Sequence, residues 1–354
     1  KKNKQLKGDF ENENYNLAIL GATGAVGHEF IKLLNERDFP FSNLKLLASS
    51  RTAGTQCVVR GKTYTVEEAK ADSFNGIDVA LFAGGPISKE FAPIAVKAGA
   101  VVIDNSSTYR MDPEVPLIVP EVNPQAILKH KGIIANPNCS TIIMVMALKP
   151  LYDLARIKRI IVSTYQAASG AGKDGLDELE RQIKQAAAGE EMTAHIFPGA
   201  AFPKHYPLAL NLVPHIDVFQ PNLYTKEEMK MVNETKKIFD DYEMGITATT
   251  VRVPVYRSHS ESVNVELEKE VSLEAMRDAL SHFPGVVLQD DPQNQIYPMP
   301  LYTSDKNDVY VGRLRKDESA PRCYNFWCVG DQIRKGAALN TMQIAEVMIK
   351  NGWL

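Results

Sequence analysis

"NLAILGATGAVGHEFIKLLNER", residues 16–37, is the stretch that decides the fold. Its first five residues, 16–20, are apolar apart from Asn16 and predict a short buried strand, and apolar residues recur at helical spacing in its second half. Between them stand Gly21, Gly24 and Gly27, which permit a tight turn and a close backbone approach to a pyrophosphate at the helix N-terminus. The stretch therefore predicts a dinucleotide-binding loop, lined by Gly21, Thr23, Gly24, Ala25, Val26 and Gly27.

Strands and helices alternate on the C-terminal side of this loop. Further short strands are expected at 44–49, 77–83 and 101–107, with a helix in 88–100. Such alternation is typical of a Rossmann-type, doubly wound parallel sheet. The pattern ends near residue 136.

The pattern changes from Cys139 onward. Longer strands are expected there, and the helices accompanying them suggest an α+β domain with a mixed sheet. The expected strands are 157–169, 246–256, 262–269, 309–315 and 323–329, and the expected helices are 139–149, 174–188, 225–240 and 272–282. Residues 16–138, joined by the C-terminal helix 334–354, are thus assigned to an NADP-binding domain, and residues 139–333 to a second domain. Residues 1–15 are polar and are expected to be a disordered extension or an artificial remnant.

Composition excludes several classes of protein. The chain has 354 residues, 44% of them apolar and 23% charged, with a net charge of -3, which suits two globular domains rather than a nucleic-acid or membrane partner. The four cysteines, at 57, 139, 323 and 328, show neither C-x-x-C pairing nor zinc-type spacing, so no metal is expected. Cys323 and Cys328 are interpreted as small apolar filler. A reducing, cytoplasmic location fits this cysteine usage best.

The end of the second strand indicates which cofactor is bound. An NAD site would offer a carboxylate there for the ribose 2′-hydroxyl, but "SSRTAG", residues 49–54, offers none. Arg51, flanked by Ser49 and Thr52, suits a 2′-phosphate instead. The sequence therefore favours NADP over NAD, although an exposed, solvated arginine is the simpler alternative.

Cys139 lies in a helix-start signal, "NPNCSTI". Asn138 is a fair N-cap, so Cys139 would fall in the first helical turn, where the helix dipole and free N–H groups stabilise a thiolate. Beside a nicotinamide domain, such a thiolate can add to an aldehyde and become a thioester after hydride transfer. Water, phosphate or coenzyme A could then cleave the thioester.

At this point the sequence resembles the aspartate-semialdehyde dehydrogenase family. The resemblance runs in the family's order from residue 19 to about 340. It rests on the motifs "LGATGAVG", "ASSRTAG", "DNSSTYRMD", "VPEVNP", "IANPNCSTI", "STYQAASGAG", "KEEMKMVNETKKI", "VRVPVYRSHSESV" and "GDQIRKGAALN". It implies NADP-dependent, reversible conversion of aspartate 4-semialdehyde and phosphate to 4-aspartyl phosphate, on the route to lysine, threonine and methionine. It also implies a homodimer or homotetramer, with 139–333 as the catalytic and dimerisation domain.

The resemblance also implies roles for individual residues. Cys139 would be the nucleophile, His259 the acid/base whose imidazole titrates near neutrality, and Gln166 the residue that orients the substrate. Arg252 would bind the substrate carboxylate and Glu227 its amine, with the adjacent Glu228 as a competitor for the amine. The phosphate-binding residues would be Arg110, Asn138 and Lys230, and the residues touching the nicotinamide Ser169, Gly170 and Gln332.

Three alternatives remain open. A sister acyl-phosphate reductase of the N-acetylglutamyl-phosphate type, or a glyceraldehyde-phosphate dehydrogenase, would share the thiolate chemistry with a different carboxylate contact. A coenzyme A-dependent reductase would not need Lys230 or Arg110 for phosphate. A non-catalytic relative acting as a binding protein should have lost its nucleophile or base, but Cys139, Gln166, Arg252 and His259 are all present.

Overall fold

The computed structural model describes residues 15–354, which form two compact units. One unit contains the described residues up to Pro137 together with Ala338–Leu354, and the other contains Asn138–Ala337. The expectation for residues 1–14 lies outside the described part, whereas Tyr15 already belongs to the first strand. None of the described helices is long and apolar enough to cross a membrane.

The first unit is built on a six-stranded sheet in the order β5-β2-β1-β6-β7-β8, and every strand pair in it is parallel. This confirms the predicted doubly wound sheet. A separate hairpin of β3 and β4 was not expected from the sequence. The elements are β1 (Tyr15–Leu20), α1 (Ala25–Glu36), β2 (Phe41–Ala48), β3 (Gln56–Val59), β4 (Lys62–Thr65), β5 (Glu67–Glu68), β6 (Val79–Phe82), α2 (Ser88–Lys97), β7 (Val101–Asp104), β8 (Ile133–Ala135) and α8 (Leu339–Lys350).

Side chains of β1 alternate between two hydrophobic cores, because successive residues of a strand point to opposite faces. Leu17 and Ile19 belong to the core that includes α1 and α8, whereas Ala18 and Leu20 belong to the core that includes α2. Helices therefore cover both faces of this sheet. A strand buried on both faces reads as one continuous apolar run, which explains why it is so easily predicted.

The second unit is built on a mixed sheet in the order β10-β9-β11-β14-β13-β12. Its outer pairs β10·β9 and β12·β13 are parallel and its inner pairs are antiparallel, which confirms the predicted mixed sheet. The elements are α3 (Cys139–Leu154), β9 (Ile157–Gln166), α4 (Gly172–Ala188), α5 (Lys226–Phe239), β10 (Gly245–Arg252), β11 (His259–Leu267), α6 (Leu273–His282), β12 (Val286–Leu288), α7 (Pro300–Thr303), β13 (Val309–Lys316), β14 (Cys323–Gly330) and a π-helix at Arg334–Ala338.

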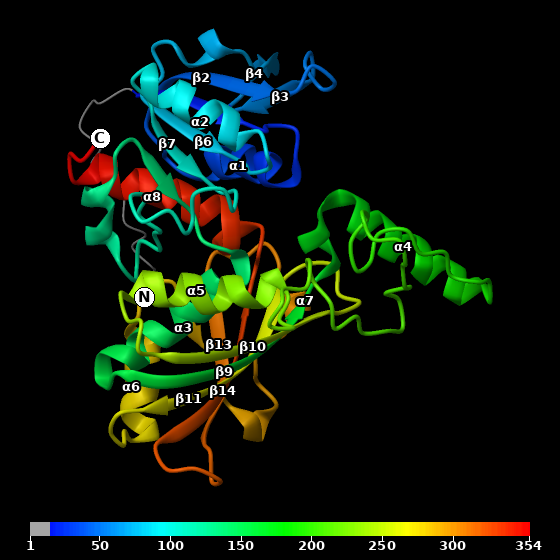
Figure 1. The fold of residues 1–354 in the computed structure, drawn as a ribbon, viewed down its shortest axis with the longest axis vertical. Coiled ribbons are helices and arrows are strands. Elements are labelled where there is room, and N and C mark those ends of the chain that lie inside the picture. The colour runs from blue at the N-terminus through cyan, green and yellow to red at the C-terminus, as the bar shows by residue number, and fades with distance from the viewer. Residues whose placement is uncertain (1–14) are drawn as a thin grey trace. The chain divides into compact units, whose positions relative to one another are not determined.

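Helices α5, α3 and α6 form one layer against this sheet, with α3 in contact with its four central strands (Figure 1). Within residues 15–354, no such layer of helices covers the opposite face of the sheet, which we call the open face. Exposed or half-exposed side chains lie along it, among them Ile161, Tyr165, Ser262 and Trp327. The catalytic residues predicted from the sequence lie on the helix-covered side or at the strand ends.

Two strand boundaries differ from expectation for identifiable reasons. The strand expected at 246–256 ends at Arg252, two residues before Pro254, which cannot donate to a ladder. The strand expected at 262–269 begins at His259, because "HSE" is polar in sequence but fully buried in the structure. A run of polar residues gives no strand signal, so only the fold reveals that these residues belong to the sheet.

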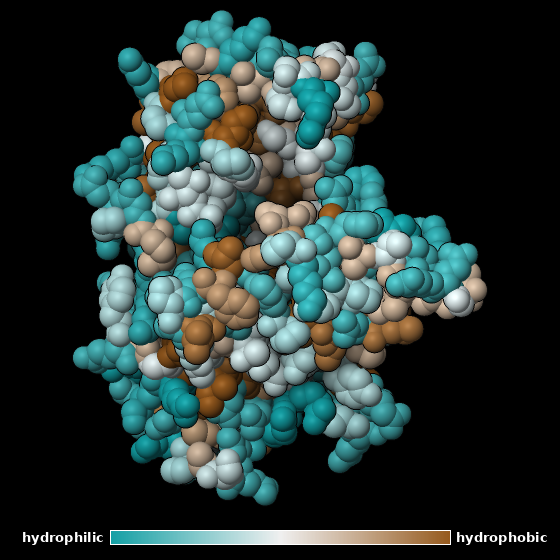
Figure 2. All heavy atoms as spheres, turned by 45° about the vertical axis from the view of Figure 1, so that its right-hand side comes forward, coloured by the Kyte–Doolittle hydropathy of each residue, from teal (hydrophilic) through white to brown (hydrophobic). Residues whose placement is uncertain are grey.

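The outer surface has a mixed composition. On the face drawn in Figure 2, hydrophilic side chains dominate and hydrophobic ones occur in small groups between them. Isolated exposed apolar residues are normal on a folded protein and need no special explanation.

Candidate active site

Cys139 is the first residue of α3, as the sequence predicts. Asn138 is the N-cap: its Oδ1 accepts hydrogen bonds from the N–H groups of Ser140 (3.1 Å) and Thr141 (3.2 Å). The Cys139 side chain is half-buried and forms no disulfide within the described residues. A thiol in this position feels the positive end of the helix dipole, which favours the thiolate.

Glu227 makes polar contacts with three side chains near the start of α3. Its Oε1 accepts hydrogen bonds from Nδ2 of Asn138 (3.0 Å) and Nε2 of Gln166 (3.2 Å), and its Oε2 lies 3.1 Å from Nζ of Lys230. Burial opposes ionisation of this carboxyl, but the charge of Lys230 and the Asn138 amide outweigh it and lower the pKa of Glu227 to about 2. The Glu227 carboxylate is therefore ionised, and its contacts with Asn138, Gln166 and Lys230 hold it in one orientation.

Glu228 is occupied elsewhere. It forms a capping box with Thr225 at the start of α5, and its Oε1 accepts a hydrogen bond from the N–H of Thr250 at 3.0 Å. Adjacent residues on a helix point in different directions, so only one of the two carboxylates can face the Cys139 end of α3. The geometry favours Glu227 for a role at the substrate amine.

Lys230 is held between two carboxylates. Its Nζ lies 2.9 Å from Oδ2 of Asp217 as well as 3.1 Å from Oε2 of Glu227. Burial alone would lower the pKa of Lys230, but these carboxylates raise it, so the ammonium is charged. A phosphate would have to share this ammonium with both partners.

Gln166 and Arg252 lie side by side where parallel strands β9 and β10 end. Oε1 of Gln166 accepts a hydrogen bond from the Thr164 hydroxyl (2.9 Å), and Nη1 of Arg252 donates to the carbonyl of Ala167 (2.8 Å). Burial lowers the pKa of Arg252, while the charges of Glu227 and Cys139 act in the opposite direction. A buried guanidinium within the field of the thiol is suited to a substrate carboxylate.

His259 is fully buried at the start of β11, and its environment differs from the sequence expectation. Burial lowers the pKa of His259 to about 3, and the Arg252 charge adds to this effect. The expectation that this imidazole titrates near neutrality is therefore wrong. Its Nδ1 accepts a hydrogen bond from the N–H of Ala167 at 3.0 Å, so the single proton of the neutral ring belongs on Nε2. Nε2 has no hydrogen-bond partner in the described part of the chain.

Gly170 and Gln332, assigned to the nicotinamide by resemblance, lie close to this group. A Cβ atom at Gly170 would lie 2.6 Å from Nη1 of Arg252 and 3.3 Å from Nε2 of His259, so a side chain there would displace the Arg252 guanidinium. Gln332 donates from Nε2 to the Ser169 hydroxyl at 2.6 Å. The second unit thus brings together Asn138, Cys139, Gln166, Ser169, Gly170, Glu227, Lys230, Arg252, His259 and Gln332.

The glycine loop of the first unit fits a dinucleotide. Gly21 has φ +85°, and a Cβ at Gly27 would lie only 2.2 Å from the carbonyl oxygen of Gly21. Helix α1 starts after Gly24, which has no side chain to cap it, so the first N–H groups of the helix remain available to a pyrophosphate. The loop therefore has the conformation that its glycine spacing predicts.

The residues predicted to hold the 2′-phosphate follow β2. The hydroxyls of Thr23 and Thr52 are 3.0 Å apart, which places the glycine loop beside the "SSRTAG" segment. Arg51 is exposed and makes no hydrogen bond or ion pair with any described residue. Its guanidinium can therefore meet a phosphate without breaking an existing contact.

Arg110, the third predicted phosphate ligand, belongs to the first unit and is buried there. Its Nε donates to the carbonyl of Asn136 and its Nη2 to the carbonyl of Asn105, both at 2.9 Å. These bonds orient the guanidinium rigidly.

Sequence patterns missed a second buried carboxyl group near His259. Glu261 follows two residues later on the same face of β11 and has no exposed surface. Its Oε2 lies 3.7 Å from Sγ of Cys328, and Oε1 has no hydrogen-bond partner within residues 15–354. Burial raises the pKa of Glu261 well above its usual value, so the folded chain favours the neutral form of this carboxyl. Cys328 is thus more than apolar filler, and no pattern in the sequence signals this pair.

We expect Glu261→Gln to become more stable than the parent chain as the pH rises. The carboxyl takes up a proton on folding at any pH above its unfolded pKa of about 4.3, so its contribution to the free energy of unfolding falls by about 1.4 kcal/mol per pH unit until the folded-state pKa is reached. The amide avoids this loss. Urea unfolding between pH 4 and pH 8 measures the difference.

The matched control is Glu266→Gln on the same strand, where Lys158 lowers the pKa of the carboxyl. This variant should show no gain at high pH. A pH-independent difference for Glu261→Gln would contradict the assignment of a neutral carboxyl.

These features define a class of protein. A parallel-sheet unit with an open glycine loop, joined to a unit that presents a helix-start thiol among a guanidinium, an amide and a neutral imidazole, is a nicotinamide-dependent dehydrogenase that acts on aldehydes through a thiolate. Two family models agree with this class: "Semialdehyde dehydrogenase, NAD binding domain" matches residues 16–130, and "Semialdehyde dehydrogenase, dimerisation domain" matches residues 148–335.

Individual relatives narrow the class. The chain is 53% identical to an aspartate-semialdehyde dehydrogenase of Aquifex aeolicus, covering 96% of this chain and 99% of the relative, and 49% identical to that of Bacillus subtilis, covering 94% and 97%. The structure of aspartate semialdehyde dehydrogenase II from Vibrio cholerae complexed with ASA matches with a TM-score of 0.91 at 44% identity, covering 96% and 99%. The chain belongs to the aspartate-semialdehyde dehydrogenase family, and the resemblance drawn from its motifs is confirmed.

Proposed function

We propose that the chain catalyses the reversible, NADP-dependent conversion of L-aspartate 4-semialdehyde and phosphate to L-4-aspartyl phosphate, a step towards lysine, threonine and methionine. The observation that carries this proposal is the group around Cys139: a helix-start thiol together with a buried guanidinium and a buried, ionised carboxylate. Arg252 suits the substrate α-carboxylate and Glu227 its ammonium group. Aspartate semialdehyde carries both charges beside its aldehyde.

The thiolate of Cys139 attacks the aldehyde carbon, and the carbonyl oxygen becomes an oxyanion. The Nε2–H of His259 donates a hydrogen bond to this oxygen. A bound nicotinamide cofactor supplies the hydride acceptor. When the C–H bond of this carbon breaks and the hydride leaves, the C–O bond becomes a carbonyl again and a thioester remains on Cys139. No proton has to be stored on His259 during these steps, which suits an imidazole whose pKa is about 3.

Phosphate then attacks the thioester carbon, and the thiolate leaves to the N-terminus of α3, where the dipole stabilises it. We assign Lys230, Asn138 and Arg110 to phosphate. The ammonium of Lys230 and the guanidinium of Arg110 provide the positive charge, and the Asn138 amide provides a neutral donor.

The test of this proposal is an NADP-linked assay with three aldehydes: aspartate semialdehyde, N-acetylglutamate semialdehyde and glyceraldehyde 3-phosphate. We expect aspartate semialdehyde to be preferred by roughly 100-fold or more in kcat/KM, because a binding group left unpaired in a buried site is costly. NADPH formation should require phosphate or arsenate. Sustained turnover with coenzyme A in place of either anion would support a coenzyme A-dependent reductase instead.

NADP rather than NAD is proposed as the cofactor because Arg51 is exposed and has no partner among the described residues. A solved relative from Candida albicans was crystallised with NADP, at 25% identity and a TM-score of 0.74, covering 96% of this chain. We expect Arg51→Ala to raise the KM for NADP roughly 10- to 100-fold, the value of a charge-assisted hydrogen bond. The KM for NAD should barely change. Lys97→Ala, which removes another exposed charge from the same unit, is the control, and equal effects on both cofactors would contradict the assignment.

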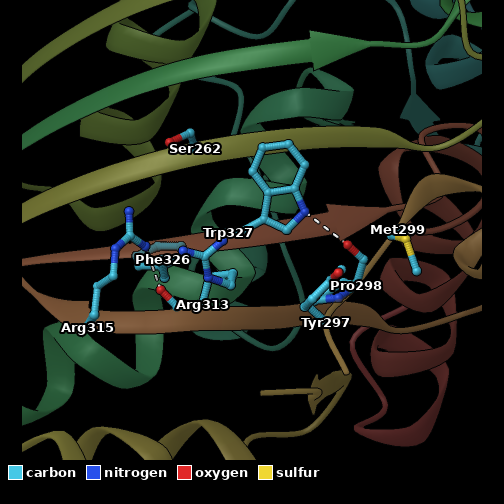
Figure 3. A pocket seen from close by; sticks show the side chains of 8 residues that line it. All are labelled: Ser262, Tyr297, Pro298, Met299, Arg313, Arg315, Phe326 and Trp327. Atoms are coloured by element: carbon cyan, nitrogen blue, oxygen red, sulfur yellow. Dashed lines mark hydrogen bonds between the residues drawn. The ribbon is translucent and has the colours of Figure 1, made fainter. Parts of the chain in front are cut away.

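We propose further that the chain forms homodimers through the open face of the mixed sheet. The match to a dimerisation domain spans this sheet, and the open face contains a cavity of about 380 Å³ beside Trp327, Arg313 and Arg315 (Figure 3). The Trp327 indole is held there by a hydrogen bond to the Pro298 carbonyl at 3.0 Å. Sedimentation equilibrium distinguishes a dimer from the alternative, a tetramer.

Because a catalytic thiolate needs a reducing compartment, we also propose a cytoplasmic location.

A further inference from the structure

Asp331, the first residue after β14, makes more contacts than an ordinary loop carboxylate. It has no exposed surface. Its Oδ1 accepts hydrogen bonds from the N–H groups of Ile333 and Arg334, both at 3.0 Å. Its Oδ2 accepts from Nε of Arg257 at 2.6 Å and from the N–H of Asp305 at 2.7 Å. One carboxylate therefore joins two segments that are more than seventy residues apart in sequence.

The first of these segments leads into the π-helix Arg334–Ala338. The N–H of Gly336 donates to the Asp331 carbonyl at 3.0 Å, which closes a π-turn of six residues, 331–336. Such π-turns are rare and are often found at functional sites. The Asp331 side chain accepts hydrogen bonds from the first N–H groups of this turn, so it anchors the turn at its start.

Gly336 packs directly on the nucleophile. A Cβ atom at Gly336 would lie 3.0 Å from Cβ of Cys139 and 3.3 Å from its Cα. That separation is tighter than ordinary van der Waals contact, so no side chain can be added without moving the turn or Cys139. The π-turn is therefore in direct contact with the first residue of α3.

The second segment leads into His259. Arg257 is ion-paired with Asp331, and Ser258 has φ +75°, an unusual conformation for a residue other than glycine. The N–H of Ser258 donates to Oε1 of Gln332 at 2.8 Å, so the residue after Asp331 holds this segment as well. His259 follows immediately. The two residues before His259 are therefore held in place by the side chains of Asp331 and Gln332.

We propose that Asp331 is a positioning residue of the reaction: its two carboxylate oxygens connect the turn that packs on Cys139 with the segment that leads into His259, and so set the distance between thiol and imidazole. The inference rests on the proposed function, in which these two side chains act together. Asp331 itself does not touch the substrate. The competing explanation is that it forms an ordinary buried ion pair that contributes only to stability.

The test compares Asp331→Asn with Asp241→Asn. Asp241 is also a buried carboxylate held by an arginine, with Arg156 Nη2 at 2.6 Å and Nε at 2.7 Å. Its other side-chain hydrogen bonds, with Tyr152 and the N–H of Glu243, also lie outside the Cys139 group. We expect both variants to lower the melting temperature. Only Asp331→Asn should lower kcat, by roughly 10- to 100-fold, the effect of misplacing reacting groups by about 1 Å. The KM for aspartate semialdehyde should change much less.

A second readout does not depend on turnover. The rate of iodoacetamide alkylation of Cys139, followed against pH, reports the environment of the thiol. We expect Asp331→Asn to shift this profile and Asp241→Asn to leave it unchanged. A profile and kcat that stay at the parent values in Asp331→Asn, despite a lower melting temperature, would overturn the proposal.

If Asp331→Asn does not fold, Arg257→Gln decides the question with the same two readouts. A shifted profile in Arg257→Gln supports the link, and a parent-like profile and kcat in that variant overturn it. Gly336→Ala shows how large a shift direct pressure on Cys139 produces. Failure of the proposed function has a different signature, namely turnover that survives the loss of the Cys139 thiol.

Discussion

Replacing Cys139 with serine is expected to lower kcat for aspartate semialdehyde by on the order of 10⁴-fold or more, because the acyl group has no other carrier between oxidation and release. The serine hydroxyl is nearly isosteric but stays protonated at neutral pH, where even the dipole of α3 cannot ionise it. Steady-state NADPH formation in the presence of phosphate measures the loss. The fold should be retained, since the cap of α3 is made by the Asn138 side chain and the N–H groups of Ser140 and Thr141, not by the sulfur.

The matched control is Cys57→Ser in β3, a free and half-buried cysteine of the other unit. Burial raises the pKa of the Cys57 thiol, so this cysteine should react with iodoacetamide more slowly than Cys139 does. We expect one equivalent of reagent to label Cys139 first and to abolish activity in parallel. Activity that persists after complete labelling of Cys139 would remove the basis of the proposed function.

Replacing His259 with leucine is expected to lower kcat roughly 10²- to 10³-fold, the usual effect of losing one oxyanion donor. His259→Gln should retain much more activity, because a glutamine amide can present an N–H near the position of Nε2. This ordering is a consequence of the ring being a neutral donor with its proton on Nε2. If proton transfer through the imidazole were required, both variants would lose activity to the same extent.

The pH dependence provides an independent check on His259. With a pKa of about 3, the ring stays neutral from pH 5 to pH 8, so its own ionisation should produce no acid limb in kcat/KM over that range. The His259→Gln variant should therefore keep the parent profile. The control His282→Leu changes an exposed histidine of α6 and should affect neither rate nor profile. An acid limb near pH 6.5 that disappears in His259→Gln would contradict a neutral donor.

Much of the fold could be predicted because its signals are local. The glycine spacing of residues 21–27 predicts a tight turn that other residues could not adopt. In the structure Gly21 has φ +85°, and Gly27 lies so close to the Gly21 carbonyl that a Cβ would not fit. Asn138 before Cys139 is a helix cap in the sequence and in the structure. Continuous apolar runs are typical of strands that are buried on both faces, so the parallel sheet can be predicted from the sequence alone.

The candidate site was predictable only as a set of residues. The motif order identified Gln166, Glu227, Arg252 and His259, but not which atoms they offer to one another. Glu227 and Glu228 are chemically identical in sequence, and they differ because Glu228 caps its own helix while Glu227 meets Asn138 and Lys230. The exposed segment around Arg51 needed no tertiary partner, so its suitability for a 2′-phosphate could be inferred directly.

The sequence alone determined the class of fold, the helix-start thiol and the family, since turns, caps and hydrophobic periodicity depend on residues a few positions apart. Only the tertiary structure decided that burial lowers the pKa of His259 while its Nδ1 accepts a hydrogen bond, that burial raises the pKa of Glu261, and that Asp331 joins two distant segments. The physical reason is that ionisation and orientation depend on burial and on partners from other strands and helices. Those neighbours become adjacent only when β9, β10, β11 and β14 assemble into one sheet beneath α3 and α5.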